Sequence, residues 1–417
     1  MPETVLTPSI VVVGGGHAGA ALCHELASAG VGTQVHLVCA EPDLPYQRPP
    51  LSKAFLKSAN QTLQPLRGEP WFAEAGITLH RGEPGESIDR SNRCLELRSG
   101  RKLSYNWLVL ATGTRARTLP SLPSTLHNVA VLRSSDDATR LRTLLASASH
   151  VIILGGGFIG LEIAATANAS GKQVTVIEAA PRLLGRSVSQ ETAQHLLATH
   201  RSAGIEILCN STVERFETQD GRLVALIVNG RRHAVEVLVL GIGAQPNVEL
   251  AEAAGLACDD GVLVDRCMRT SDPAILAIGD VARFPGEHGE TRRLESVQNA
   301  NDQARTAAST IVGPPQPYAA LPWFWSDQGT VRLQIAGLMP ARSRRHLRPG
   351  PKPGSFSILH YQDDVLVCVE SLNAPADHLA ARKLLNAQSS LPPELACDST
   401  RPLGSVLPPA ETLTENV

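Results

Sequence analysis

Residues 10–19 read IVVVGGGHAG, four β-branched apolar residues that run directly into a glycine-rich loop. The apolar run is typical of a buried strand, and the glycines at 14, 16 and 19 follow the GxGxxG spacing. Gly14 permits a tight turn, Gly16 lets a pyrophosphate approach the backbone, and Gly19 lets the next helix pack on its strand. That helix is expected to open near His17 with its free N–H groups facing an anion, so the stretch predicts a dinucleotide site.

A second strand and an acid extend this first unit. Residues 34–38 are expected to form the strand that follows the helix, and Glu41 comes shortly after them. An acid in this position accepts hydrogen bonds from the hydroxyls of an adenosine ribose. The alternative is a solvated acid at a strand end, and the context of loop, helix and strand favours the ribose contact.

Composition limits the classes of protein to consider. With 417 residues the chain is expected to form two or three domains, on a prior of about 150 residues per domain. A net charge of −2 argues against a general affinity for nucleic acid or membrane. The eight cysteines are dispersed without a CxxC pair, which predicts neither a metal site nor a redox dithiol. No apolar run approaches the ~20 residues of a membrane span, so a cytoplasmic location is expected.

The segment YQRPPLSK at residues 46–53 is expected to form a rigid ledge, because its paired prolines fix the backbone before a short helix near Ser52. Arg48 and Lys53 flank this ledge. They are placed to contact a bound cofactor, but two solvent-facing charges are the simpler interpretation of these residues alone.

The layout of the first unit then repeats. A buried strand over residues 151–154 leads into Gly155, Gly157 and Gly160, which restate the GxGxxG spacing, and a helix, a strand and Glu178 follow. Further strands are expected at residues 206–208, 213–218, 223–228 and 234–240, with turns at Asp220-Gly221 and Asn229-Gly230. The two units close on similar sequences, LVLATG at 108–113 and LVLGIG at 238–243. Two dinucleotides are therefore predicted.

Residues 274–282 (AILAIGDVA) are predicted to form an apolar strand that ends on Gly279 and Asp280. An acid at the carboxyl end of a strand is placed to accept hydrogen bonds from the hydroxyls of a ligand. The competing interpretation is an ordinary surface turn. A helix is expected over residues 294–312, after which Gly313 and several prolines mark a domain boundary.

A different composition begins beyond this boundary. Trp323 and Trp325 lie within PWFWSDQ, and residues 332–338 alternate like a strand. The stretch from residue 391 is rich in proline and is expected to be loosely ordered. A basic run follows the predicted strand and comprises Arg342, Arg344, Arg345, Arg348 and Lys352. Most such runs are solvated faces, which is the alternative to a docking surface here.

Together these motifs resemble the FAD-dependent pyridine-nucleotide reductases, and within them the ferredoxin reductases of bacterial Rieske dioxygenase and heme monooxygenase systems. The resemblance covers nearly the whole chain. It is carried by GGGHAGA at 14–20, RPPLSK at 48–53, ATG at 111–113, LRSSDDA at 132–138, GGGFIGLEIAA at 155–165, IEAAPRLLGR at 177–186, GIGAQPN at 241–247, AIGDVA at 277–282, RLESVQNANDQAR at 293–305 and PWFWSDQ at 322–328. Glu41 falls one position later than the acid of some relatives.

The resemblance implies an α/β fold with two Rossmann-like dinucleotide-binding domains of the glutathione-reductase type and a C-terminal α+β domain. The implied domains are an FAD-binding domain in two parts, residues 1–116 and 247–318, an NAD-binding domain at residues 117–246, and a C-terminal interface domain at residues 319–417.

The same resemblance implies FAD on the first unit and NADH on the second. Lys53 and Glu162 would pair beside the isoalloxazine, where the ammonium stabilises negative charge on the reduced ring, and Trp325 would pack at the flavin. These three residues are the catalytic candidates. The cofactor-binding candidates are Gly14, Gly16, His17, Ala18, Gly19, Glu41, Arg48, Lys53, Ala111, Thr112, Gly113, Arg133, Gly155, Gly157, Phe158, Ile159, Gly160, Glu178, Gly243, Gly279, Asp280, Val297 and Trp325.

The implied reaction is hydride transfer from NADH to FAD, followed by single-electron transfer to a [2Fe-2S] ferredoxin. We expect NADH to be preferred over NADPH, because the carboxylate of Glu178 accepts from a 2′-hydroxyl and repels a 2′-phosphate; Arg182 nearby weakens this inference. The basic run at Arg342, Arg344, Arg345 and Arg348 is the expected docking surface for ferredoxin.

Two other functions share these dinucleotide folds. A disulfide reductase needs a reactive cysteine near the flavin, but Leu51, Ser52 and Lys53 follow the paired prolines. A flavoprotein similar to apoptosis-inducing factor would use its NADH-reduced form as a binding signal, and it would turn over slowly with every ferredoxin.

Overall fold

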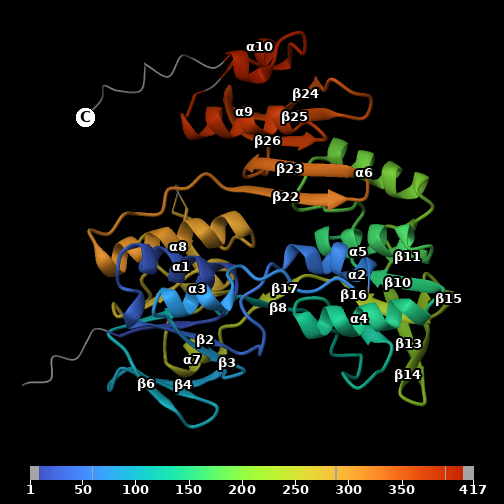
Figure 1. Ribbon diagram of the computed structural model, residues 1–417. Helices are drawn as coiled ribbons and strands as arrows, with labels where there is room; N and C mark the ends of the chain where they lie inside the picture. Colours follow the sequence, from blue (N-terminus) through green and yellow to red (C-terminus); the bar gives the residue numbers. More distant parts are fainter. Residues whose placement is uncertain (1–8, 59, 287–288, 390, 407–417) are drawn as a thin grey trace, which may run out of the picture. The chain divides into compact units, whose positions relative to one another are not determined.

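The computed structural model describes residues 9–58, 60–286, 289–389 and 391–406, and the chain divides into two compact units (Figure 1). Each unit is built from three separate segments. The first unit comprises Met1–Pro50, Thr62–Arg115 and Ala244–Ala320, and the second comprises Leu51–Gln61, Ala116–Gly243 and Leu321–Val417.

The first unit is organised around a five-stranded parallel sheet. The strand order is β19-β7-β1-β2-β3, with β1 (Ile10–Val13) at the centre. The other strands are β2 (Val35–Cys39), β3 (Thr78–Arg81), β7 (Trp107–Leu110) and β19 (Ile275–Ala277). Because both faces of a parallel sheet are covered, its strands are continuous apolar runs, as the sequence of β1 predicts.

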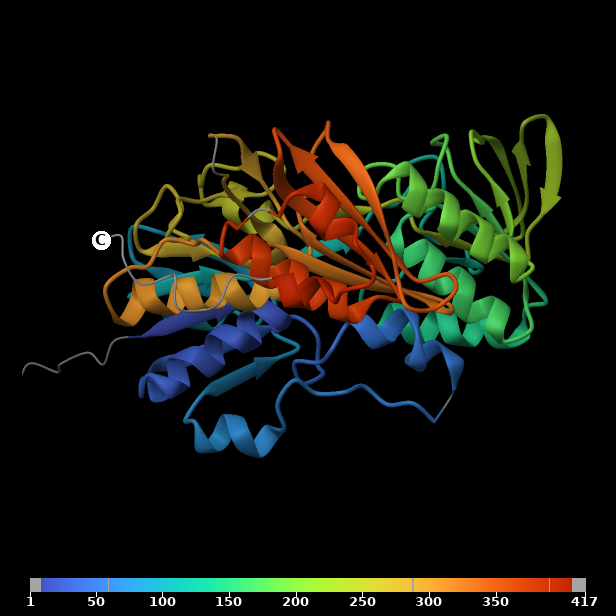
Figure 2. The ribbon, with the colours of Figure 1, turned by 90° about the horizontal axis from the view of Figure 1, so that it is seen from above.

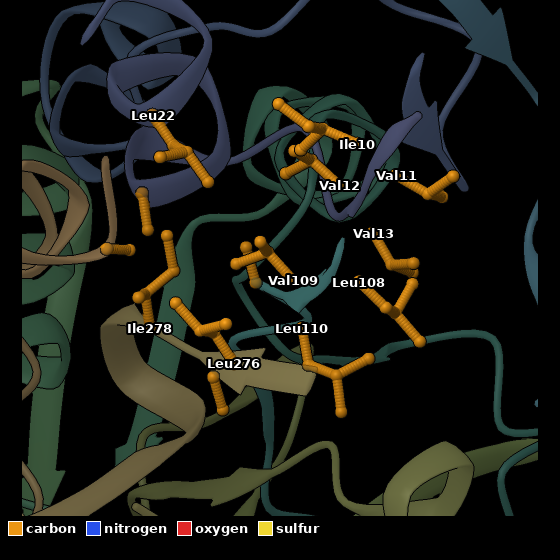
Figure 3. Close-up of a cluster of buried hydrophobic side chains, with 14 of the residues drawn as sticks. Ile10, Val11, Val12, Val13, Leu22, Leu108, Val109, Leu110, Leu276 and Ile278 are labelled. Atoms are coloured by element: carbon orange, nitrogen blue, oxygen red, sulfur yellow. The ribbon is translucent and has the colours of Figure 1, made fainter. Parts of the chain in front are cut away.

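Two helices pack side by side against this sheet. They are α1 (His17–Ser28) and α8 (Val297–Val312), and Figure 2 shows them as neighbours. Leu22 of α1 lies among the side chains of β1, β7 and β19 in a fully buried cluster (Figure 3). Burying one such leucine contributes roughly 1.5–3 kcal/mol. The predicted strand, glycine loop and helix are thus all confirmed.

The remaining elements of the first unit are short. They are η1 (Gly32–Gln34), α3 (Glu69–Glu74), the antiparallel strands β4 (Gly85–Asp89), β5 (Cys94–Leu97) and β6 (Lys102–Ser104), the pair β8 (Thr114–Ala116) and β17 (Ala244–Pro246), α7 (Glu249–Ala253), and β18 (Val262–Leu263), η3 (Gly279–Val281), β20 (Ala282–Pro285) and β21 (Thr291–Arg292). The strand predicted over 274–282 is therefore interrupted, because Gly279 has a φ of +76° that begins a 3₁₀ turn.

The second unit repeats the arrangement with another five-stranded parallel sheet of order β12-β11-β10-β16-β9. Its strands are β9 (Val129–Ala130), β10 (His150–Leu154), β11 (Gln173–Ile177), β12 (Glu206–Leu208) and β16 (Val237–Leu240). The helices are α2 (Ala54–Lys57), α4 (Ser135–Ser147), α5 (Phe158–Ala169) and α6 (Gln190–Ser202). The predicted internal repeat is confirmed, since β10, α5 and β11 follow the same order as β1, α1 and β2.

A three-stranded antiparallel sheet is inserted before β16. It consists of β13 (Val213–Gln219), β14 (Arg222–Val228) and β15 (Arg231–Ala234). The single strand predicted over 234–240 is wrong, because the chain changes sheets between Ala234 and Val237. The side chain of Asn128 fixes this change of sheet: its amide nitrogen donates to Leu223 O at 2.8 Å and to Glu236 O at 3.0 Å.

The C-terminal part of the second unit is a five-stranded antiparallel sheet of order β22-β23-β26-β25-β24. Its elements are β22 (Trp323–Gln328), β23 (Val331–Gly337), β24 (Arg344–Pro349), β25 (Phe356–Gln362), β26 (Val365–Leu372), α9 (Pro375–Asn386), α10 (Pro393–Cys397) and η4 (Leu403–Val406). The sheet contributes to two cores. Leu333 and Ile335 pack with the apolar side chains of α5 and β10, whereas Ala336 and Val369 pack with α9.

Arg348 was predicted to belong to a basic docking surface, and this prediction is wrong. Its side chain is 4% exposed, and Nε lies 3.2 Å from both carboxylate oxygens of Asp377. Its other nitrogens donate to the carbonyl oxygens of Ala396, Asp398 and Arg401 at 2.5–2.9 Å. A guanidinium with five donors is therefore used to fasten the chain after α9.

The expectation that the chain is loosely ordered from residue 391 is also wrong for residues 391–406. Leu391, Ala396 and Leu403 are buried in the same cluster as α9. Residues 407–417 lie outside the described part of the chain. No helix among the described residues has both the length and the hydropathy that a membrane span needs.

Replacing Arg348 by Met should destabilise the protein by about 3–5 kcal/mol, because it leaves the buried carboxylate of Asp377 without its partner. Urea unfolding followed by circular dichroism measures the change. Arg344→Met is the matched control, because Arg344 lies in the same strand as Arg348 but forms only an exposed ion pair with Asp364. Such exposed pairs contribute about 0–1 kcal/mol. Equal losses in the two variants would contradict the structural role of Arg348.

Candidate functional site

The glycine loop of the first unit has no room for side chains at two of the three glycines that form its GxGxxG motif. A Cβ atom on Gly14, whose φ is +120°, would lie 2.1 Å from the carbonyl oxygen of Ala111. A Cβ on Gly19 would lie 2.0 Å from the carbonyl oxygen of Gly14. The end of β1, the start of α1 and the end of β7 therefore approach one another as closely as backbones can.

Gly16 differs from these two glycines, because a Cβ atom built on it would meet nothing within 4 Å. It is the N-cap of α1, and no side chain caps that helix. By contrast, serine side chains cap α4, α6 and α8. Open space at an uncapped helix N-terminus is the arrangement that accepts a pyrophosphate, so these residues fit the first half of a dinucleotide cofactor.

The Gly279–Asp280 turn lies at the same end of the sheet. A Cβ on Gly279 would lie 2.8 Å from the Cβ of Ala18, and the backbone N–H of Gly279 donates to Gln303 Oε1 of α8 at 2.7 Å. Thr114 Oγ1 lies 3.5 Å from the Asp280 carboxylate. Asp280 thus stands outside the carboxyl ends of β1, β7 and β19, where ligands of parallel α/β sheets bind.

Glu41 and Arg48, which the sequence places at opposite ends of a loop, form an ion pair. Arg48 Nη2 lies 2.6 Å from Glu41 Oε1, and Tyr46 OH donates to Glu41 Oε2 at 2.6 Å. Arg48 Nη1 also donates to Tyr46 OH at 3.1 Å. The two predicted cofactor residues are therefore brought together, and Tyr46 is a member of the cluster that sequence reasoning missed.

The ATG segment is held by a residue that sequence reasoning also missed. Asn247 Nδ2 donates to Thr112 O at 2.8 Å, its backbone N–H donates to Gly113 O at 2.9 Å, and Thr112 Oγ1 donates to Asn247 O at 2.8 Å. Asn247 ends the motif GIGAQPN at 241–247, but the sequence does not indicate its partners. Asn247 orients the predicted cofactor residues Thr112 and Gly113.

The second glycine loop repeats the geometry of the first. A Cβ on Gly155, whose φ is +103°, would lie 2.3 Å from Gly241 O, and one on Gly160 would lie 2.3 Å from Gly155 O. The nearest atom to a Cβ on Gly157 is 3.8 Å away, and α5 begins there without a side-chain cap. Ile159 in the first turn of α5 is 47% exposed. The loop thus offers a second pyrophosphate site.

Glu178 is fixed directly beside this second loop. Its two carboxylate oxygens accept from the backbone N–H groups of Gly156 at 2.6 Å and Ala180 at 2.7 Å. The guanidinium of Arg182 donates to the carbonyl oxygens of Gly185 and Val188 at 2.6 and 2.7 Å. Two of the donors of Arg182 are therefore used to hold its own loop.

Lys53 and Glu162 form the predicted pair, with 2.7 Å between Lys53 Nζ and Glu162 Oε2. Glu162 lies on α5 with its side chain 5% exposed, while the Lys53 side chain is 22% exposed. Ser52 Oγ and Ser326 Oγ also donate to the Glu162 carboxylate, at 2.5 and 2.6 Å. Sequence reasoning assigned no role to these two serines, although Ser52 lies within the motif RPPLSK and Ser326 within PWFWSDQ.

Trp325 lies on β22 next to a second tryptophan, with 5.7 Å between the ring centroids of Trp323 and Trp325. The guanidinium of Arg382 from α9 lies 4.3 Å from the centroid of Trp323. His378 packs edge-on against Trp323, and burial together with the nearby Arg382 and Arg332 lowers its pKa to about 4. Sequence reasoning missed Arg382 and His378, because no motif marks α9.

Three further predicted residues lie at the start of a helix or next to a strand. The backbone N–H of Arg133 donates to Asp137 in the capping box of α4. Gly243 accepts a backbone hydrogen bond from Arg117 at 2.9 Å. Val297 begins α8 directly after its capping residue, Ser296. Their roles toward a cofactor remain predictions.

The described residues contain no group of three or more His, Cys, Asp or Glu side chains placed to hold a metal ion. All eight cysteines lie within the described residues and are free thiols. Fold and site together define the class of proteins with two dinucleotide-binding motifs, one at each glycine loop.

Comparison with known proteins agrees with this class. The family described as "Pyridine nucleotide-disulphide oxidoreductase" matches residues 8–304, and "Reductase C-terminal" matches residues 323–407. Similar proteins include rhodocoxin reductase of Rhodococcus erythropolis, 41% identical over 94% of this chain and 92% of that protein, and terpredoxin reductase of Pseudomonas sp, 42% identical over 95% and 97%.

Solved structures show the same likeness. A ferredoxin reductase for the CYP199A2 system from Rhodopseudomonas palustris is 41% identical with a TM-score of 0.91, covering 95% of this chain and 99% of that one. The covalent putidaredoxin reductase-putidaredoxin complex is 35% identical with a TM-score of 0.90, covering 95% and 97%. The chain belongs to the pyridine nucleotide-disulphide oxidoreductase family, whose members bind FAD and NAD(P)H, and it is an oxidoreductase.

The glycines at 14 and 16 give a matched pair of substitutions. Gly16→Ala should leave the melting temperature of the apoprotein close to wild type, because its φ is −79° and the added methyl group meets no protein atom. It should nevertheless weaken FAD binding, measured by quenching of flavin fluorescence, because the methyl group occupies the space open to the pyrophosphate. Gly14→Ala should instead destabilise the apoprotein itself. Unchanged FAD affinity in Gly16→Ala would mean that the pyrophosphate lies elsewhere.

Proposed function

We propose that this protein is an NADH-dependent ferredoxin reductase that passes electrons from NADH through FAD to a [2Fe-2S] ferredoxin. The observation that carries the proposal is the repeated glycine loop, which gives each unit an uncapped helix N-terminus beside an open space. Bound FAD supplies the chemistry that converts a two-electron hydride donor into a source of single electrons. The ferredoxin follows from relatives that are named as reductases of ferredoxins.

We assign FAD to the first unit and NADH to the second. The first unit has the Gly16 space, the Glu41–Arg48 pair and Asp280 for the two ends of FAD. The boundaries 1–116 with 247–318, 117–246 and 319–417 remain our proposed FAD, NAD and interface domains. Lys53 is the proposed cation that stabilises negative charge on the reduced flavin, and Glu162 orients it.

The coenzyme preference is assigned to Glu178. Its carboxylate is held by two backbone N–H groups at the end of β11, where it accepts from the 2′-hydroxyl of NADH and repels the 2′-phosphate of NADPH. Two of the five donors of Arg182 are occupied by the carbonyl oxygens of Gly185 and Val188, which reduces its availability to a phosphate.

Glu178→Gln should therefore narrow the ratio of kcat/KM for NADH to that for NADPH by about tenfold, mainly by raising activity with NADPH. Steady-state reduction of ferricyanide measures both values. Glu191→Gln, an exposed acid in the first turn of α6, is the control and should leave the ratio unchanged. A wild-type enzyme that uses the two coenzymes equally would overturn the assignment.

The docking surface for ferredoxin needs revision. With Arg348 buried, the predicted run retains Arg342, Arg344 and Arg345, and two of these form ion pairs with Asp364 and Glu191. We propose that Arg382, which stacks on Trp323 next to Trp325, makes the stronger contribution together with Arg332, which is 57% exposed and forms a long ion pair with Asp327 at 3.9 Å. Arginine and aromatic residues are enriched at protein interfaces.

Arg332→Gln combined with Arg382→Gln should raise the KM for an acidic [2Fe-2S] ferredoxin and leave the KM for NADH unchanged. Ferredoxin-dependent turnover of the wild type should also fall between 0.1 M and 1 M salt, as the Debye length drops from about 10 Å to about 3 Å. Arg344→Gln combined with Arg345→Gln is the comparison and should have the smaller effect. If only the substitutions at Arg344 and Arg345 raise the KM for ferredoxin, ferredoxin docks on the basic run at residues 342–345.

Neither the cysteines nor the relatives favour the two alternative functions, a disulfide reductase and a signalling flavoprotein. The thiol of Cys39 lies next to Gly15 in the glycine loop, but burial, followed by the charge of Glu41, raises its pKa to about 12. It is thus a poor nucleophile for a disulfide reductase. A signalling flavoprotein would pass electrons from NADH to a dye but would turn over slowly with every ferredoxin, which the turnover measurement above detects.

A further inference from the structure

The carboxylate of Glu162 receives four donors and therefore has the environment of an anion. Oε2 accepts from Ser52 Oγ at 2.5 Å and Lys53 Nζ at 2.7 Å. Oε1 accepts from Ser326 Oγ at 2.6 Å and from the backbone N–H of Asp327 at 3.3 Å. The ammonium and the backbone N–H are obligatory donors, whereas the two hydroxyl groups can turn either way.

Gln328 decides which way the hydroxyl of Ser326 turns. Its amide nitrogen donates to Ser326 Oγ at 2.7 Å, which occupies an acceptor site of that oxygen and directs the hydroxyl hydrogen toward Glu162. The same amide nitrogen lies 3.4 Å from Phe158 O, where only a donor is compatible. Ser326 and Gln328 point to the same side of β22, which packs against α5 (Figure 1).

His200 of α6 completes the chain of hydrogen bonds. Its Nε2 lies 3.1 Å from Gln328 Oε1, and because an amide oxygen only accepts, this nitrogen carries the hydrogen. Burial lowers the pKa of His200, so the ring is neutral and Nδ1 carries none. His200, Gln328 and Ser326 are each less than 3% exposed, and their hydrogen bonds all run in one direction, toward Glu162.

We propose that Ser326 and Gln328, oriented by His200, are positioning residues that keep Glu162 ionised and thereby hold Lys53 as an ammonium ion. The inference rests on the role proposed above for Lys53. The charged and titratable groups around Glu162 are Lys53, Asp327 through its N–H, and His200 through Gln328. None of the three relay residues needs to touch the flavin, since they act through Glu162 and Lys53.

Ser326→Ala and Gln328→Met test this relay. The ¹³C signal of the Glu162 carboxyl group, identified by its loss in Glu162→Gln, should change its chemical shift in Ser326→Ala relative to wild type, because the carboxylate loses one of its four hydrogen-bond donors. Flavin reduction by NADH should slow about tenfold in stopped-flow measurements, with the greater loss at acid pH. Gln328→Met should change both quantities in the same direction but less.

Three further variants separate this role from packing. Ser326→Thr keeps the hydroxyl group and should restore the wild-type pH profile. Ser357→Ala removes an equally buried serine of the same sheet that bonds to Ser371 and Asp377, and it should leave the Glu162 signal unchanged. Adding Ser326→Ala to Lys53→Met should slow flavin reduction no further, because the relay acts only through the ammonium.

The outcomes distinguish the relay from the proposed function. If Lys53→Met leaves flavin reduction at the wild-type rate, the role of Lys53 is wrong and the relay has no catalytic consequence. If Lys53→Met slows reduction while Ser326→Ala and Gln328→Met leave both the carboxyl signal and the pH profile as in wild type, the relay alone is overturned.

Discussion

The structure depends on a steric constraint, the contact of backbone with backbone at the two glycine loops. A Cβ atom on Gly14 would lie 2.1 Å from Ala111 O, and one on Gly155 would lie 2.3 Å from Gly241 O. Both distances are well below any normal contact. This close approach sets the angle at which α1 and α5 leave their strands. Each helix then presents its N-terminal N–H groups beyond the carboxyl edge of its sheet, near Asp280 in the first unit and Glu178 in the second.

The second unit adds electrostatics to this framework. Glu162 is on α5, so the helix that opens at the glycine loop also carries the buried anion that binds Lys53. A buried carboxylate is tolerated only when donors surround it. Ser326 reaches it from β22, which joins the packing of the C-terminal sheet to the position of one ammonium group.

Much of this arrangement could be predicted from the sequence. Strand–glycine–helix patterns determine local structure, so β1, α1, β10 and α5 were found, and the Lys53–Glu162 pair followed from the family resemblance. Asn247, Ser326 and Gln328 could not be assigned roles, because their partners lie tens of residues or more away along the chain. Arg348 shows the same limit, because the other four members of its basic run are exposed. Its buried, structural role depends on Asp377 and on three carbonyl groups that lie far away along the chain.

The interleaving of the two units also has a consequence for the order of folding during synthesis. The parallel sheet of the first unit includes β19, and α8 packs on α1, so that core is completed only after residue 312 has left the ribosome. The segment Ala116–Gly243, in contrast, contains all five strands of the second parallel sheet without interruption. All strands of the second parallel sheet are therefore synthesised before β19, which pairs with β7 and completes the sheet of the first unit.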